Sequence, residues 1–210
     1  MSFAVRARTA WALGLRNMVR AVTYRTAIRA GIHPVQKIAF EAPAGPFFRE
    51  PVTVSPLPSR DEWQGEMRAF GHLPVPIGPA PPNWHANVMD GSVQDAGDRA
   101  WWTIPDFGSV DIKTVWELSR FDWVIAFVQM AATGEAPALA RLNAWLDDWL
   151  AANRPGRGPN WKCGQEASIR LLHLAAGALI LDQIDRPEPA LAALVRLHLQ
   201  RIAPTLSYAL

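Results

Sequence analysis

The chain has 210 residues, of which 50% are hydrophobic, so it can bury a sizeable core, and a disordered protein is excluded. Its formal net charge is only +2, and its single cysteine, Cys163, excludes an intramolecular disulfide or a thiolate metal cluster. No stretch approaches the roughly 20 apolar residues that span a bilayer, and there is no clear signal peptide, so the compartment stays open.

Residues 1–40 are predicted to contain a basic amphipathic helix between residues 3 and 30. Apolar side chains recur there at helical spacing, and all seven Lys and Arg residues of this segment precede the first acidic residue, Glu41. Gly31 is a typical residue for the helix end. Such a helix can pack on its own domain, attract an anionic polymer, or let residues 1–30 lie on an anionic membrane surface.

Residues 41–110 are predicted to form an irregular segment with at most short strands. They contain eleven of the eighteen prolines and show little helical periodicity. The segment also carries four large aromatic side chains, Trp63, Trp84, Trp101 and Trp102. Because a free linker would not contain so many tryptophans, we expect the segment to wrap over a helical core.

Residues 111–210 have a strongly helical pattern. Gly134 should end the first helix and Pro137 should open the second, because the missing N–H of proline is harmless in a first turn. The predicted helices are 112–133, 136–153, 164–183 and 188–209. Their short loops indicate antiparallel hairpins, which can belong to a bundle, a solenoid or part of an α/α toroid. The side chains expected to be largely buried are Trp116, Trp123, Phe127, Trp145, Trp149, Leu171 and Leu174.

A polar loop that runs into a helix is the first candidate site. Asn160 and Trp161 lie in the loop, and Glu166 and Arg170 follow at the helix start, four residues apart. A tryptophan face stacks on a pyranose ring, while amide and guanidinium groups bind hydroxyls or a carboxylate. These residue types suit a sugar site, although a solvated ion pair between Glu166 and Arg170 is the ordinary structural explanation.

A second charged helix start lies at Asp111, which is a natural N-cap. Lys113, Trp116 and Arg120 follow at spacings of three and four residues and therefore share one face. Arg120 lies in an otherwise apolar helix and needs a partner or a ligand. We therefore predict that Arg120 and the helix start from Glu166 to Arg170 line one groove, with Asn160 and Trp161 at its edge.

Other chemistries find no support in the sequence. The five histidines show no pair at metal-ligand spacing, so no metal site is predicted. No phosphate-binding glycine loop or nucleophile elbow is present, so no cofactor is expected. Cys163 precedes a helix without an evident base, which favours a packed thiol over a nucleophile. The basic segment lacks a base-reading motif, so no nucleic acid is predicted as a partner.

One combined pattern joins these segments. It consists of Asp111, Lys113, Trp116, Glu117, Leu118 and Arg120, then Thr133-Gly134, then Asn160-Trp161 followed by Glu166, Ser168, Ile169 and Arg170. Earlier stretches that belong with it are Gly31-Ile32-His33-Pro34 and Trp84-His85-x-Asn87. This pattern resembles the N-terminal region of the heparinase II/III family of polysaccharide lyases. The match covers nearly the whole chain, and the two halves together are fairly specific.

The resemblance implies a mainly α fold, in which antiparallel hairpins form part of an incomplete α/α toroid around a groove for an acidic, uronate-containing polysaccharide. It also implies β-elimination, in which a polar group neutralises the uronate carboxylate while a tyrosine and a histidine act as base and acid. The residues expected to bind substrate are Asn160, Trp161, Arg170, Arg120 and Lys113. The residues expected to support the groove are Asp111, Trp116, Glu117 and Glu166.

No residue of this sequence matches the catalytic asparagine, tyrosine or histidine of the family, which in its members follow a segment like 206–210. The resemblance therefore implies no catalytic residue in these 210 residues and a partnership with the C-terminal part of a parent enzyme. We expect the chain alone to show no elimination activity on heparan sulfate or alginate.

Two other functions stay open at the level of sequence. A toroid glycoside hydrolase could use two carboxylates, for instance Asp111 and Glu166, and would release no unsaturated uronide. A non-catalytic carbohydrate-binding or membrane-peripheral helical module would need neither carboxylate.

Overall fold

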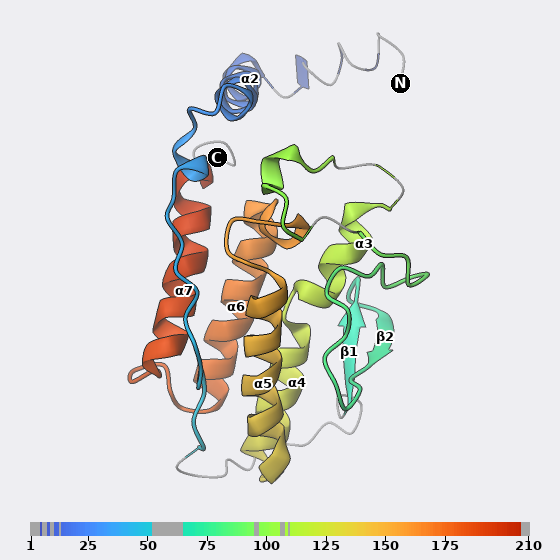
Figure 1. The fold of residues 1–210 in the computed structure, drawn as a ribbon, viewed down its shortest axis with the longest axis vertical. Helices are drawn as coiled ribbons and strands as arrows, with labels where there is room; N and C mark the ends of the chain where they lie inside the picture. Colours follow the sequence, from blue (N-terminus) through green and yellow to red (C-terminus); the bar gives the residue numbers. More distant parts are fainter. Residues whose placement is uncertain are drawn as a thin grey trace.

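The computed structural model describes residues 14–51, 65–94, 97–105 and 110–206, together with residues 5, 8, 11, 12 and 108. They form a mainly helical protein with a small two-stranded sheet, which confirms the predicted class (Figure 1). The helices are α2 (Leu15–Arg29), α3 (Ile112–Trp116), α4 (Asp122–Ala132), α5 (Ala136–Ala152), α6 (Gly164–Ile180) and α7 (Pro189–Ile202). The strands are β1 (Glu66–Ala69) and β2 (Leu73–Pro76). Short 3-10 helices lie at Pro34–Gln36, Trp101–Thr103, Glu117–Ser119, Pro159–Trp161 and Ala203–Thr205.

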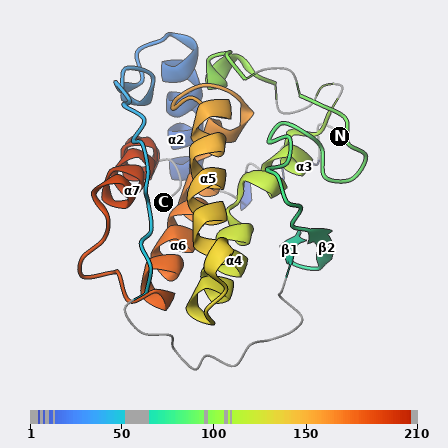
Figure 2. The ribbon, with the colours of Figure 1, turned by 60° about the horizontal axis from the view of Figure 1, so that its bottom comes forward.

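The helices α4 to α7 lie side by side and make the body of the molecule (Figures 1 and 2). α4 contacts both α5 and α6, and α7 packs on α6. Aromatic rings fill the space between them: Trp123, Phe127 and Trp145 have centroid distances of 5.1 to 6.2 Å. Tilted and edge-to-face pairs of this kind add about 0.5–1.5 kcal/mol each to the free energy of burial. The loops that connect these helices therefore start and end on helices that are packed together.

The burial predicted from helical periodicity is largely confirmed. Trp123, Phe127, Trp145, Trp149 and Leu174 are buried. Trp116 and Leu171 are only partly buried. Trp116 lies at the end of α3, where its ring borders a cavity.

Local signals account for the bounds of α5. Gly134 has a φ of 93° in the turn after α4, and Pro137 lies in the first turn of α5, as predicted. At the other end, the backbone N–H of Asn153 donates to the carbonyl of Trp149 at 2.8 Å. The observed helix, Ala136–Ala152, thus agrees with the predicted 136–153.

The helix predicted for 112–133 is divided in the structure, so this expectation was wrong. The 3-10 turn Glu117–Ser119 follows α3, and Phe121 then adopts a left-handed backbone conformation with a φ of 69°. The Phe121 ring is fully buried and packs on Trp123 and Trp149 at 5.2 and 4.8 Å. Burial of this ring offsets the cost of the left-handed backbone, about 1–2 kcal/mol, and helical periodicity cannot reveal such a compensation.

The last two helices are shorter than predicted. α6 ends at Ile180 rather than at residue 183, and Asp182 has a φ of 54° in the turn that follows. α7 ends at Ile202, because Pro204 in the next 3-10 turn has no N–H to continue the helical ladder. Residues 207–209, which complete the predicted helix, lie outside the described residues.

Several of the described residues between α2 and α3 pack against the helical body. Trp84 and Trp101 are buried, and Trp102 is partly buried. This agrees with the expectation, drawn from the number of tryptophans, that the segment packs on a helical core. The indole Nε1 of Trp84 donates to Asp148 on α5 at 2.6 Å. Trp63 lies outside the described residues. The two strands pair in antiparallel fashion, and β1 contacts α4.

The N-terminal helix α2 ends at Arg29, and Gly31 follows with a φ of 70°, which confirms the predicted end. No residue of α2 is fully buried, although Ile28 packs on the core. Most of the predicted helix before residue 14 lies outside the described residues. None of the helices that the structure describes is both long and apolar enough to cross a membrane.

Candidate functional site

The loop and helix start predicted to bind sugar lie inside the protein. Asn160, Trp161 and Arg170 are each 0% exposed. The Nδ2 of Asn160 donates to the carbonyl of Trp84 at 3.0 Å and to the Asn153 side chain at 2.8 Å. The indole of Trp161 donates to the carbonyl of Asn153 at 2.9 Å. The prediction that Asn160 and Trp161 lie at the edge of a groove was therefore wrong, because these two side chains hold the loop onto the end of α5 and onto Trp84.

Arg170 is buried among aromatic rings and a neutral histidine. Its Nε donates to Nε2 of His198 at 3.0 Å, and its Nη2 donates to the carbonyl of Asn160 at 2.8 Å. The guanidinium carbon lies 5.0 and 5.4 Å from the ring centroids of Trp149 and Trp161. Burial lowers the pKa of Arg170 to about 9 and that of His198 to about 3. Arg170 therefore packs the interior and has no exposed surface with which to meet a substrate.

Arg120 binds two buried carboxylates. Its Nε and Nη2 donate to the two oxygens of Glu166 at 2.7 and 2.9 Å, and its Nη1 pairs with Glu117. Glu117 also accepts the backbone N–H of Phe70 at 2.6 Å. Hydrogen bonding to Glu166 raises the pKa of Arg120, and burial raises the pKa of Glu117. The partner that Arg120 required is thus a carboxylate pair of its own chain, and Glu166 pairs with Arg120 rather than with Arg170.

Of the described residues at the helix start near Asp111, only Trp116 borders a cavity. Asp111 caps α3 by accepting the backbone N–H of Lys113 at 3.0 Å, as expected of an N-cap. Lys113 is exposed on the first turn. The indole of Trp116 donates to the carbonyl of Pro159 at 2.9 Å, and its ring faces a cavity.

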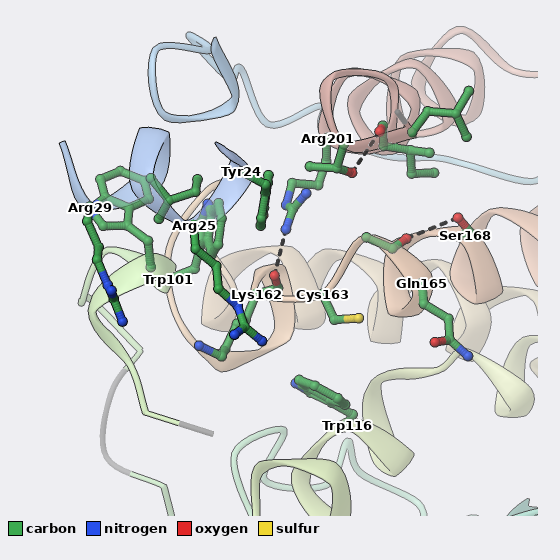
Figure 3. A pocket seen from close by; sticks show the side chains of 16 residues that line it. Tyr24, Arg25, Arg29, Trp101, Trp116, Lys162, Cys163, Gln165, Ser168 and Arg201 are labelled. Carbon is green, nitrogen blue, oxygen red and sulfur yellow. Dashed lines mark hydrogen bonds between the residues drawn. The ribbon is translucent and has the colours of Figure 1, made fainter. Parts of the chain in front are cut away.

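That cavity, of about 960 Å³, lies between α2, the Trp101 turn and the start of α6, and we call it the α2–α6 pocket. Figure 3 shows side chains from α2, α6 and α7 converging on it. Four aromatic residues line it, namely Tyr24, Trp101, Trp102 and Trp116. Four cationic residues also line it, namely Arg25, Arg29, Lys162 and Arg201. No Asp or Glu is among the described residues that line the pocket, so its walls are aromatic and positively charged.

Arg201 is the most firmly held of these cations. Its Nε and Nη2 donate to the carbonyls of Trp161 and Lys162 at 2.8 and 2.6 Å. Its guanidinium carbon lies 4.4 Å from the ring centroid of Trp101. Burial lowers the pKa of Arg201. The side chain thus joins α7 to the loop before α6 and holds a positive charge at the pocket wall.

The two cations from α2 are held more loosely. Arg25 and Arg29 are exposed and lie one helical turn apart, with Tyr24 beside them (Figure 3). The Tyr24 ring packs edge-on against His33 at 5.0 Å. Exposed guanidinium groups in a pocket that tryptophan rings also line can pair with an anionic ligand.

The sequence predicted roles for several of these residues, but it did not predict that they line one pocket. Arg25 and Arg29 belong to the predicted basic helix, and Trp101 and Trp102 were predicted as anchors. Arg201 was not singled out, although it follows Leu194 and Leu197 at spacings of seven and four on the buried face of α7. An arginine on such a face is the signal that could have identified it.

Among the described residues, no group of three or more His, Cys, Asp or Glu could hold a metal ion. No family model, curated protein or solved structure matches the chain. The function is therefore inferred from the pocket itself and from the sequence pattern.

Proposed function

We propose that this chain binds an acidic, uronate-containing polysaccharide and is the substrate-groove portion of a lyase that acts by β-elimination. The observation that carries the proposal is the composition of the α2–α6 pocket, with four aromatic and four cationic residues and no described carboxylate. Aromatic faces stack on pyranose rings, and guanidinium groups pair with carboxylates. That no described lining residue is acidic matters, because a carboxylate in the pocket would repel a uronate.

The lyase part of the proposal rests on the sequence pattern from Asp111 to Arg170. The structure supports it only through the mainly helical body. In this proposal α4 to α7 are antiparallel hairpins of an incomplete α/α toroid, and the α2–α6 pocket is one end of its groove. Acid and base for the elimination would come from the C-terminal part of a parent enzyme. The chain's own contribution is to bind and orient the polymer and to neutralise its charge.

The hydrolase alternative is less favoured because both of its candidate carboxylates have structural partners. Asp111 caps α3, and both oxygens of Glu166 accept hydrogen bonds from Arg120. A catalytic acid must reach the glycosidic oxygen. Glu166, at 3% exposure and with both oxygens bound by Arg120, cannot reach a substrate.

Calorimetric titration with alginate or heparan sulfate oligosaccharides tests binding, with uncharged maltooligosaccharides for comparison. Replacing the pocket arginines (Arg25→Gln with Arg29→Gln) should weaken binding roughly three- to tenfold, since exposed charges each contribute modestly. The matched control, Arg8→Gln with Arg16→Gln, removes the same charge from exposed positions that do not line the pocket. Equal effects of the two double substitutions, or equal affinity for the neutral sugar, would refute a site in this pocket.

The lyase assignment is tested by following unsaturated uronide in the near ultraviolet. We expect no product from the chain with any uronate polymer, and product when a longer parent protein is supplied. Turnover by the chain alone would contradict the assignment of its acid and base to another region. An inactive parent protein would contradict the lyase assignment and leave the binding proposal standing.

A second candidate, a membrane-peripheral module, is favoured by one observation. The first half of α2 exposes Leu15, Val19 and Val22, at 78%, 56% and 62%, beside the exposed Arg16. Apolar and basic side chains on one helix suit an anionic lipid surface. Co-sedimentation of the full chain with vesicles, with and without anionic lipid, tests it. Val19→Gln with Val22→Gln should reduce sedimentation, and an unchanged bound fraction would reject this role for α2.

A further inference from the structure

The first turn of α6 opens into the α2–α6 pocket without a side-chain cap. The 17-residue helix begins at Gly164, and the preceding Cys163 makes no capping hydrogen bond. The first N–H groups of a helix have no partner within the helix, and its dipole places about half a positive charge there. Gly164 and Gln165 line the pocket, whereas Glu166, the acidic residue of this turn, is bound to Arg120.

Arg201 places a hydrogen-bond donor without a partner next to the same helix start. Its side chain is 1% exposed, and its Nη1 is buried without a hydrogen-bond partner, while Nε and Nη2 are fixed by two carbonyls. A Cβ placed on Gly164 would lie 3.7 Å from this Nη1, so the unpartnered donor is adjacent to the first residue of α6. Figure 3 shows the guanidinium pointing from α7 toward Lys162 and the helix start. A buried donor without a partner destabilises the protein, and an acceptor on a ligand would satisfy it.

We infer that these groups form an anion subsite, in which the N-terminal N–H groups of α6 and Nη1 of Arg201 bind one oxyanion of a sugar chain. The inference rests on the proposed function, because it assigns the charged group of the polysaccharide to one position in the pocket. Helix N-termini and guanidinium groups both favour carboxylate and sulfate oxygens. The shared chemistry is a singly charged oxyanion, either the C5 carboxylate of a uronate or a sulfate ester.

The surroundings favour a charged group that is attached to a sugar ring. Gly164 has no Cβ, and a Cβ there would lie only 2.9 Å from Oγ1 of Thr205, so glycine lets Thr205 and Arg201 approach the helix start closely. The Trp101 ring, which lies under the Arg201 guanidinium, lines the same cavity as Trp116. A sugar with its oxyanion at the helix start would therefore have aromatic surface available for its ring.

The test uses Gln165→Glu, which places a negative charge in the subsite. Gln165 is exposed, and an acidic residue in a first turn interacts favourably with the helix dipole, so the fold should be retained. Gln200→Glu on α7 is the matched control, because it makes the same change at an exposed position outside the pocket. Arg201 itself is not replaced, since it holds two backbone carbonyls. Gly164→Ala, whose methyl group would displace Oγ1 of Thr205 and lie beside Nη1 without adding charge, is the second variant.

Affinity is measured by calorimetry for uronate trisaccharides, for a sulfated but uronate-free oligosaccharide and for inorganic sulfate. We expect Gln165→Glu and Gly164→Ala to weaken binding of at least one oxyanion ligand roughly tenfold or more, and Gln200→Glu to change it less than about twofold. The uronate and sulfated arms show which oxyanion the subsite prefers.

The outcomes separate the subsite from the proposed function. If uronate oligosaccharides bind and both pocket variants bind them as tightly as the unaltered chain, the subsite is wrong and the function stands. If only inorganic sulfate or the sulfated oligosaccharide binds, and Gln165→Glu abolishes that binding, the subsite stands and uronate binding is wrong. If no ligand binds, both are wrong.

Discussion

Arg120 shows how one residue can stabilise several parts of the chain. Its guanidinium satisfies Glu166 and Glu117, whose side chains are only 4% and 2% exposed. Arg120→Ala would leave two carboxylates close together without a counter-charge. We expect the free energy of unfolding, measured by denaturant titration, to fall by about 3–5 kcal/mol, because the remaining charges are buried and unpaired.

The control for this prediction is an exposed arginine in a loose ion pair. Arg154 lies 3.7 Å from Asp98, and both side chains are largely exposed, so Arg154→Ala should cost no more than about 1 kcal/mol. Equal losses for the two substitutions would mean that the Arg120 cluster is not a tightly coupled unit.

At the scale of elements, two side chains of α5 hold the segment before β1: Asp147 accepts the backbone N–H of Gly45 at 3.2 Å, and Asn143 makes the other contacts. The Oδ1 of Asn143 accepts the backbone N–H groups of Phe47 and Phe48 at 2.7 and 3.0 Å, and its Nδ2 donates to the Phe48 carbonyl at 2.9 Å. Both phenylalanine rings are buried in the main core. The Asn143 amide thus satisfies three backbone groups of this segment.

Asn143→Ala should therefore release that segment while the helices stay folded. We expect a loss of about 2–3 kcal/mol of stability, because buried backbone groups lose their partners, and faster hydrogen exchange at the amides of Phe47 and Phe48. Asn143→Asp keeps the acceptor and removes only the donor, so its effect should be smaller. Unchanged exchange at both amides in the alanine variant would contradict this anchoring role.

At the scale of the whole molecule, stability should depend on pH through the buried contact between α6 and α7. His198 accepts from Arg170 through Nε2, its Nδ1 bonds the carbonyl of Leu194, and its pKa is lowered to about 3 by burial and by Arg170. Because the folded pKa lies below the unfolded value of about 6.5, the unfolded chain binds the proton more readily. The stability from this group is therefore complete above pH 6.5 and is lost progressively as the pH falls.

Denaturant titrations at several pH values test this dependence. The unaltered chain should lose about 2 kcal/mol from this group between pH 7 and pH 5. His198→Gln, whose amide can also accept from Arg170 and donate to Leu194, should remove that component of the slope. Parallel pH profiles for the two proteins would show that His198 does not titrate as its burial requires.

The sequence by itself determined the features that depend on neighbours along the chain. A 3.6-residue period predicts the mainly helical class. Glycine, proline and capping residues predict the bounds of α5, the end of α2 near Gly31 and the N-cap at Asp111. Burial of Trp123 and Trp149 follows from the same period. These signals act over a few residues, so folding of the rest of the chain does not change them.

Only the tertiary structure decided which polar residues face a cavity. Helical spacing places Glu166 and Arg170 together, but Glu166 pairs with Arg120, 46 residues away, and Arg170 turns inward to His198, 28 residues away. The pocket likewise joins Arg25, the Trp101 turn and Arg201, which no local pattern connects. The physical reason is that a period specifies which face of a helix is apolar but not which element will cover it. A buried arginine can bind a carbonyl, a ring or a carboxylate from any part of the chain.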